Sequence, residues 1–563
     1  MTMVLAVASF DNKFALAENE PLAAEFSMSD GALIRQPDPE TNSEKDENGI
    51  RFSTTITKAF YDAIELTDGQ TIKFYTLVKK DASSVTEIEF GANGLYQAEW
   101  KINGESWAAT FDDNGKYVRH TDLMNFPDDM YSTVFAARSC YVISDNDDNT
   151  EDTIVYADGE NSIRTMEGVA IKYLTELPDE FAHLNKYVGL GENGEIAVNE
   201  KVGFYGKNKG ELQIDNSGLT GDVRVYNGSR LVSGATFTNG KLVLPESEVN
   251  SAANVITLTD GIKLYQQTVK FVDFAIGTTE EFVDWAATVM QDRYGKLAPL
   301  YSVLTANIDL TGVAFADSAS NYTGNTYIES KTRTVYDRTN VGNGKASTSG
   351  VGYGYGVLKG ELDGQGYTVD GLLHTQSGLF GSVGGSGFTL KNIAFTNIEL
   401  MRKDTTTARY IFGNASSNFV LENVYFQITN TSAAATCEVS LANDCGMLIP
   451  KNCVFDFAFT YAEGAVEYTK VSVFRNRTPK SGMQNVFAIS KSYFLNELAG
   501  GKTGFGNVLY PIEGYTYSNY GRYDNYSALA SAISQGTLDM SEFTASGYWN
   551  TTAGYPVWKT ANA

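Results

Sequence analysis

The chain has 563 residues, of which 42% are hydrophobic and 20% charged, and its formal net charge is −25. This balance excludes the basic surface that nucleic-acid binding requires, and it would repel an anionic membrane or polyanion. No apolar run approaches the 18 residues of a membrane-spanning helix. The 53 glycines, 33 tyrosines and 11 prolines favour short strands and tight turns, so we expect a mainly β protein.

Residues 1–17 begin with the apolar run MTMVLAVASF and end in a small-x-small triplet, Ala15-Leu16-Ala17. A secretory signal would have this form of cleavage site, but the basic segment that normally precedes the apolar run is missing. We interpret the segment as a degenerate export signal, which predicts an extracellular or cell-surface protein. The alternative is an ordinary N-terminal strand, as in a phage protein.

Residues 18–180 are expected to form an acidic α+β module. Over residues 1–200 the sequence has 37 Asp and Glu against 15 Lys and Arg, whereas residues 301–563 have 20 against 18. Alternating runs such as IRFSTTI and IKFYTLVKK indicate half-buried strands, and helical spacing follows the strand-like DTIVYADG. The front of the chain is therefore predicted to be a well-solvated mixed unit.

One weak calcium candidate lies in this module, at Asp145, Asp147 and Asn149. Carboxylate and amide oxygens at alternate positions suit calcium. An EF-hand is excluded, because its sixth and twelfth loop positions would be Thr150 and Tyr156 instead of Gly and Glu. The alternative interpretation is a solvated hairpin tip. No other cofactor is expected.

Residues 185–274 contain about six short alternating runs separated by turn signals such as Asn227-Gly228 and Asn239-Gly240. This density of strands and turns is typical of an immunoglobulin-like sandwich. No catalytic pattern occurs there, so we interpret the segment as a spacer.

Residues 276–563 begin with a predicted helix at 279–290. The capping-box sequence from Thr278 to Glu281 precedes apolar residues at helical spacing, which are Phe282, Trp285, Ala286 and Val289. Strand-like sequence follows at once. We expect this helix to cap the first strands of the C-terminal domain.

The rest of this domain repeats with a period near 30 residues. Asn392, Asn423 and Asn452 fall in register within LKNIAFTNIEL, LENVYFQITNT and PKNCVFDFAFT. Such a period, with short strands and polar turns, indicates a solenoid whose coils bury their apolar residues against one another. We predict a right-handed parallel β-helix in which the three asparagines form a ladder of side-chain amides.

Several stretches resemble GLUG-repeat parallel β-helix proteins of bacterial surfaces, namely VLTANIDLTG, GELDGQGYTVDGL, SGLFGSV and LKNIAFTN. The closing SGYWNTTAGYPVWK resembles the last coil of such proteins. The front unit, with GIRFSTTI and VFAARSCYV, is similar to a module of clostridial surface proteins. The resemblance covers residues 48–175 and 276–560 and implies a pectin-lyase-like solenoid at the cell surface. It says little about function, because such coils occur in adhesins, lyases, glycosidases and viral fibres.

Catalysis on a β-helix would need acids aligned along one outer groove. The candidates are Asp309, Asp363 and Asp370, or Asp444 with Asp456. Each of the first three stands beside a turn, and His374 is a lone histidine, so we interpret all of these as structural residues. Carboxylates stacked on one face across adjacent coils would instead favour a carbohydrate-active enzyme.

Tyrosine-rich segments give the candidate binding residues. Exposed tyrosines on a rigid scaffold suit sugar stacking and protein contacts. The alternative is that these loops cover the flanks or ends of the domain. The candidates are Tyr322, Tyr327, Tyr353, Tyr355, Tyr515, Tyr517, Tyr520 and Tyr523.

The sequence therefore predicts a non-catalytic surface or fibre protein used for adhesion or filament assembly, with a glycan, a protein surface or copies of itself as partner. The alternatives are a polysaccharide lyase or glycosidase on the β-helix, and a phage fibre.

Overall fold

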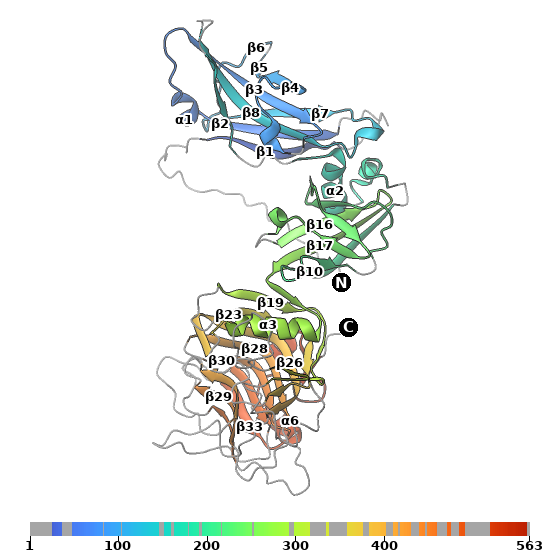
Figure 1. Cartoon of the computed structure of the whole chain (residues 1–563), viewed down its shortest axis with the longest axis vertical. Coiled ribbons are helices and arrows are strands. Elements are labelled where there is room, and N and C mark those ends of the chain that lie inside the picture. The colour runs from blue at the N-terminus through green and yellow to red at the C-terminus, as the bar shows by residue number, and fades with distance from the viewer. Residues whose placement is uncertain are drawn as a thin grey trace. The chain divides into compact units, whose positions relative to one another are not determined.

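The computed structural model describes residues 25–35, 48–291, 298–315, 334–336, 357–374, 382–400, 409–414, 417–429, 438–444, 448–458, 470–474, 484–489 and 518–559, apart from gaps at 83, 103, 146–150, 159–162, 178, 191–193, 215–216, 250–252 and 537. Over these residues the protein is mainly β with several sheets (Figure 1). The chain divides into two compact units, of which unit 1 comprises residues 1–203 and 211–270 and unit 2 comprises residues 204–210 and 271–563. Within the described residues, none of the helices has both the length and the apolar character needed to cross a membrane.

The first part of unit 1 has two larger antiparallel sheets, beside a two-stranded one formed by β5 (Lys101–Ile102) and β6 (Glu105–Ser106). One sheet has the order β1-β2-β7, and the other has the order β4-β3-β8-β9. Alternation along these strands sends one face of each into a shared aromatic core that includes Phe52, Phe74 and Trp100. The strands are β1 (Phe26–Leu33), β2 (Gly49–Thr57), β7 (Lys116–Met124), β4 (Leu95–Glu99), β3 (Gln70–Lys80), β8 (Phe135–Asp145) and β9 (Thr153–Tyr156).

Two further antiparallel sheets complete unit 1. Their orders are β10-β17-β16-β12-β13 and β11-β15-β14. Their strands are β10 (Glu195–Gly206), β17 (Lys263–Val272), β16 (Ala253–Thr259), β12 (Arg224–Asn227), β13 (Arg230–Leu231), β11 (Leu212–Gln213), β15 (Lys241–Val243) and β14 (Thr236–Thr238).

A buried carboxylate joins these sheets to the helix α2 (Met166–Glu176). Glu167, in the first turn of α2, is 2% exposed and accepts two hydrogen bonds of 2.6 Å from the Arg224 guanidinium and one of 2.5 Å from the Tyr226 hydroxyl. Because a buried charge is tolerated only with such partners, this contact holds α2 against β12.

Unit 2 is built on a series of parallel strands that we call the parallel stack, each strand being one rung. The order is β18-β19-β23-β26-β28-β30-β32-β33, and each neighbouring pair is parallel. Figure 1 shows these rungs side by side, from green at β19 to red at β33. They are β18 (Phe274–Ile276), β19 (Leu300–Leu304), β23 (Val357–Asp363), β26 (Ser382–Leu400), β28 (Phe419–Ile428), β30 (Leu448–Asp456), β32 (Gln484–Ile489) and β33 (Ser518–Tyr523).

Shorter parallel strands extend the rungs. β20 (Ile308–Asp309) pairs with β24 (Thr368–Asp370), which pairs with β26. β21 (Val313–Phe315) pairs with both β22 (Thr334–Tyr336) and β25 (Leu373–His374), and β25 also pairs with β26. A separate parallel sheet has the order β27 (Arg409–Asn414), β29 (Glu438–Asp444), β31 (Lys470–Phe474).

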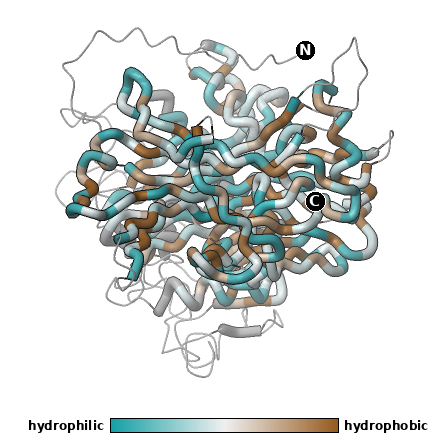
Figure 2. The backbone as a smooth tube through the Cα atoms, turned by 90° about the horizontal axis from the view of Figure 1, so that it is seen from above, coloured by the Kyte–Doolittle hydropathy of each residue, from teal (hydrophilic) through white to brown (hydrophobic). Residues whose placement is uncertain are grey.

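The core of unit 2 consists of columns of identical or similar side chains on successive rungs. Phe395, Phe426 and Phe455 are in register, and their ring centroids are 5.1 and 5.9 Å apart with nearly parallel planes. For the described chain as a whole, Figure 2 shows hydrophobic residues interspersed with hydrophilic ones along the backbone. Parallel pairing at one strand spacing stacks each apolar residue on the one before it.

The helix α3 (Thr279–Gln291) packs its apolar face against the first rungs, where Phe282, Trp285 and Ala286 are buried with Ile276 and Leu304. At its N-terminus, the Thr278 backbone N–H donates to Glu281 Oε2 and the Glu281 N–H donates to Thr278 Oγ1, both at 3.2 Å. This is the reciprocal pairing that the capping-box sequence predicts.

The asparagines at the bends of the rungs adopt left-handed backbone conformations. Asn392, Asn423, Asn452 and Asn485 have φ between 50° and 55°, which non-glycine residues other than Asn and Asp rarely adopt. The left-handed residue Asn392 turns the chain between Leu390 and Ile393, so that both side chains enter the core. In a straight strand, two residues three positions apart would point to opposite faces.

The same asparagines form a continuous hydrogen-bonded ladder. Each Nδ2 donates to the Oδ1 of the preceding rung, at 3.0 Å from Asn423 to Asn392, 3.2 Å from Asn452 to Asn423 and 2.7 Å from Asn485 to Asn452. Both ends of the ladder meet carboxylates, because Asn392 donates to Asp363 and Asn485 also donates to Glu542, each at 3.0 Å. The ladder thus satisfies amide groups that the stack buries.

We expect Asn423→Ala to destabilise unit 2 by about 2–4 kcal/mol, because it removes ladder hydrogen bonds on both sides and places alanine at positive φ. Asn423→Gly removes the same bonds without the backbone strain and is expected to cost about 1 kcal/mol less. Denaturant titration followed by hydrogen-exchange mass spectrometry measures the loss within β28.

Asn239→Ala is the matched control, since Asn239 has φ 53° but is exposed in a turn outside the ladder. This substitution is expected to lower the free energy of unfolding by about 1 kcal/mol, which is the strain of alanine at positive φ alone. A loss at position 423 no larger than the loss at position 239 would show that the ladder adds nothing.

Candidate functional site

One pocket of about 580 Å³ lies on the outer face of the parallel stack, within unit 2. Its floor consists of side chains from β20, β24, β26, β28 and β30, and its wall is provided by the C-terminal segment. The floor residues are Asn307, Ile308, Asp309, Thr368, Asp370, Thr396, Tyr425, Gln427 and Asp456, and the wall residues are Tyr526, Tyr555, Pro556, Val557 and Trp558.

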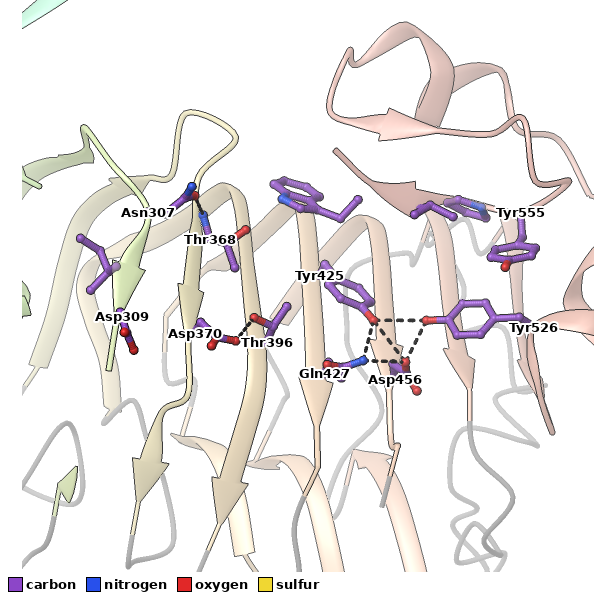
Figure 3. A pocket seen from close by; sticks show the side chains of 14 residues that line it. Asn307, Asp309, Thr368, Asp370, Thr396, Tyr425, Gln427, Asp456, Tyr526 and Tyr555 are labelled. Atoms are coloured by element: carbon purple, nitrogen blue, oxygen red, sulfur yellow. Dashed lines mark hydrogen bonds between the residues drawn. The ribbon is translucent and has the colours of Figure 1, made fainter. Parts of the chain in front are cut away.

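Strand register aligns the polar floor residues in a row. Asp309 is paired with Asp370, Asp370 with Thr396, and Gln427 with Asp456, while Thr396 and Gln427 directly follow the paired Phe395 and Phe426. Figure 3 shows Asp309, Asp370, Thr396, Gln427 and Asp456 side by side across successive strands. Because neighbouring rungs are about 4.8 Å apart, the row presents one polar group per rung.

The wall exists because the outer face of the stack becomes apolar toward its last rungs. On the row that begins with Asn307 and Thr368, the later rungs carry Val454 and Phe487. These two side chains pack with Leu529, Phe543 and Trp549 of the C-terminal segment. Burial of this apolar surface holds the segment over the last rungs. Its elements are α6 (Tyr526–Ser534), α7 (Ser541–Ala545), β34 (Trp549–Asn550) and β35 (Val557–Trp558).

At the end of the floor row, Asp456 is bonded to two tyrosines and a glutamine. Its Oδ2 accepts from the Tyr526 hydroxyl at 2.9 Å, the Tyr425 hydroxyl at 3.1 Å and Gln427 Nε2 at 3.5 Å (Figure 3). The two tyrosine hydroxyl oxygens are 3.3 Å apart. Tyr526 begins α6, so this cluster connects the C-terminal segment to the floor.

Burial dominates the electrostatics of this cluster. Asp456 is 5% exposed, and desolvation raises the pKa of its carboxyl, although the hydrogen bonds from Tyr526, Gln427 and Tyr425 act in the opposite direction. Desolvation likewise raises the pKa of the Tyr425 and Tyr526 hydroxyls, so both act as neutral donors.

The other floor carboxylates accept hydrogen bonds from nearby residues. Asp309 Oδ1 accepts from the Thr311 backbone N–H at 2.8 Å and its hydroxyl at 2.6 Å. Asp370 Oδ1 accepts from Thr396 Oγ1 at 2.5 Å and Asn397 Nδ2 at 2.7 Å. These contacts fix the directions of the carboxylates along the row.

The structure thus brings together three of the five aspartates that the sequence put forward as candidate acids. Asp309, Asp370 and Asp456 share the pocket, whereas Asp363 ends the asparagine ladder and Asp444 ends β29 in the other parallel sheet. The ladder asparagines at 392, 423 and 452 are also brought together, with Asn485 as a further member. His374 ends β25.

Of the candidate binding tyrosines, only Tyr520 and Tyr523 lie among the described residues. Tyr523 is half-buried against the C-terminal segment, with its ring centroid 6.2 Å from that of Phe487. Tyr520 lies within β33. The others lie outside the described residues, namely Tyr322, Tyr327, Tyr353, Tyr355, Tyr515 and Tyr517.

The calcium candidate and the export segment lie largely outside the described part of the chain. Asp145 is the exposed last residue of β8, whereas Asp147, Asn149 and residues 1–17 are not described. Among the described residues, no three or more His, Cys, Asp or Glu side chains gather in a group that could hold a metal.

Sequence reasoning did not single out the aromatic residues of the pocket. Tyr526 ends the tyrosine-rich stretch VLYPIEGYTYSNYGRYDNYS, and Tyr555 and Trp558 lie in the closing SGYWNTTAGYPVWK. The shared position of these aromatic residues in the wall beside the floor is a tertiary property.

Comparison of the chain with protein-family models, with curated proteins and with solved structures found no match.

We expect the contribution of Asp456 to the stability of unit 2 to fall as the pH rises above about 4, because an Asp whose pKa is higher in the folded state than in the unfolded state favours folding only while it is protonated. Asp456→Asn keeps the shape and cannot ionise. The melting temperature of this variant relative to the wild type should therefore increase from pH 4 to pH 8, as measured by calorimetry.

Asp113→Asn is the control, since Asp113 is an exposed turn residue of unit 1. The melting temperature of this control relative to the wild type should show no comparable rise with pH. The expectation would be contradicted if the melting temperature of Asp456→Asn relative to the wild type stayed constant or decreased as the pH rises.

Proposed function

We propose that this chain is a non-catalytic extracellular surface protein that binds a glycan in the pocket on the parallel stack. In this proposal the stack is a right-handed parallel β-helix, the antiparallel sheets between residues 195 and 272 form an immunoglobulin-like spacer, and the front of unit 1 is an acidic α+β module. The parallel rungs, the asparagine ladder and the stacked phenylalanines support the β-helix interpretation.

The observation that carries the proposal is the pairing of an aromatic wall with a polar row in one pocket. Tyr526, Tyr555 and Trp558 border a floor on which one polar group follows another at each rung. Sugars are bound by aromatic rings that pack on their apolar faces and by fixed polar groups that bond their hydroxyls. A pocket of about 580 Å³ is within the usual size range of small-ligand sites.

The carboxylates of the row differ in how well they suit hydrolysis, and their exposure favours binding. Asp370 and Asp456 are three rungs apart, which is about 14 Å and exceeds the separation at which two carboxyls cleave a glycosidic bond. Asp309 and Asp370 are one rung apart, about 5 Å, which is within that range. However, Asp309 is exposed and Asp370 half-buried, whereas a glycosidase acid normally sits in an apolar site. Hydrolysis by this pair is therefore the second candidate function.

Binding of purified oligosaccharides to the full-length protein, measured by calorimetry, tests the proposal. Tyr555→Ala is expected to weaken binding at least tenfold through loss of an aromatic contact. The control is Tyr96→Ala, which removes a 66% exposed tyrosine of unit 1 and should leave the affinity unchanged.

Two outcomes would count against the proposal. Equal effects of Tyr555→Ala and Tyr96→Ala would place the glycan elsewhere. Shortened products after incubation with oligosaccharides, lost in Asp370→Asn, would show that the pocket is catalytic.

A further inference from the structure

The charged side chains among the described lining residues of the pocket are of one sign. Three carboxyl side chains line it, from Asp309, Asp370 and Asp456, and none of its described lining residues is Lys, Arg or His. Asp456 is at the buried end beside the wall and Asp370 is half-buried at the more open end. The open half of the floor therefore presents carboxylates to whatever the aromatic wall holds.

The two carboxylates at the open end occupy equivalent positions on adjacent rungs, about 5 Å apart. Their orientations are set by hydrogen bonds from Thr311, Thr396 and Asn397. A fixed pair of carboxylates attracts a cation and repels an anion, and a partly desolvated pocket strengthens both effects relative to water.

From these positions we infer that the pocket takes a sugar with a free amino group, whose ammonium is held by Asp370 together with Asp309, and that it rejects uronic acids. This inference rests on the proposed glycan-binding function and specifies its ligand class. The Tyr555 and Trp558 rings supply contacts that any hexose can use. The carboxylates distinguish hexoses by the charge of their substituents.

Four sets of oligosaccharides of equal length, which differ only in the substituent, test the inference: β-1,4-linked glucosamine, N-acetylglucosamine, glucose and glucuronate. Affinities for the full-length protein are measured by calorimetry at a pH at which the amine is protonated. We expect the amine oligomer to bind at least tenfold more tightly than the glucose and N-acetyl oligomers, and the glucuronate oligomer to bind most weakly. The preference for the amine should shrink as salt is added, because screening weakens charge interactions.

Asp370→Asn tests the named residue. It keeps the side-chain shape, so it should lower the ratio of amine to glucose affinity at least tenfold, whatever its effect on the glucose oligomer. Asp113→Asn, in an exposed turn of unit 1, should leave that ratio unchanged.

The outcomes separate this inference from the proposed function. Equal affinity for amine and glucose oligomers, or tighter binding of the glucuronate, would overturn the amino-sugar inference and leave glycan binding intact. An amine preference that persists in Asp370→Asn would also overturn it. Failure of all four sets to bind would overturn the inference, and failure of a wider oligosaccharide panel would overturn the proposed function as well.

Discussion

The asparagine ladder is the constraint on which the architecture of unit 2 depends. Each asparagine bends its rung through a left-handed backbone, and Asn423, Asn452 and Asn485 each donate an amide N–H to the asparagine one rung earlier. The bend must therefore occur at the same place on every rung. Once the bends are aligned, the residues on either side are aligned too, which is why Phe395, Phe426 and Phe455 stack.

The same alignment organises the outer face. Residues that point outward also form rows, and the two rows of the pocket floor change from polar on the early rungs to apolar on the later ones. The C-terminal segment covers the apolar part, because burial of Val454 and Phe487 holds it there. The edge of the C-terminal segment lies beside the polar part of the same rows, and the pocket is the space between that edge and the polar residues. Glu542 of the segment also accepts from the last ladder asparagine, which links the covering to the stack.

Among the described residues, a buried carboxyl joins separate parts of the chain in each unit. In unit 1, Glu167 of α2 bonds with Arg224 and Tyr226 of β12. In unit 2, Asp456 of β30 bonds with Tyr526 of α6. Both junctions use a carboxylate and a tyrosine hydroxyl, but only the first includes a cation. At this second junction, burial raises the pKa of the Asp456 carboxyl.

The sequence by itself determined the periodic features of this protein. A mainly β chain, the helix that starts at Thr279 and the in-register asparagines all follow from local spacing, because period, capping and turn chemistry act over a few residues. The pocket was decided only by the tertiary structure. Asp309, Asp370 and Asp456 each look like a turn or strand-end residue in the sequence, and Tyr526 and Trp558 are far along the chain from the first two. Parallel stacking brings such distant residues to adjacent rungs, and the burial of an apolar outer face decides where the C-terminal wall stops.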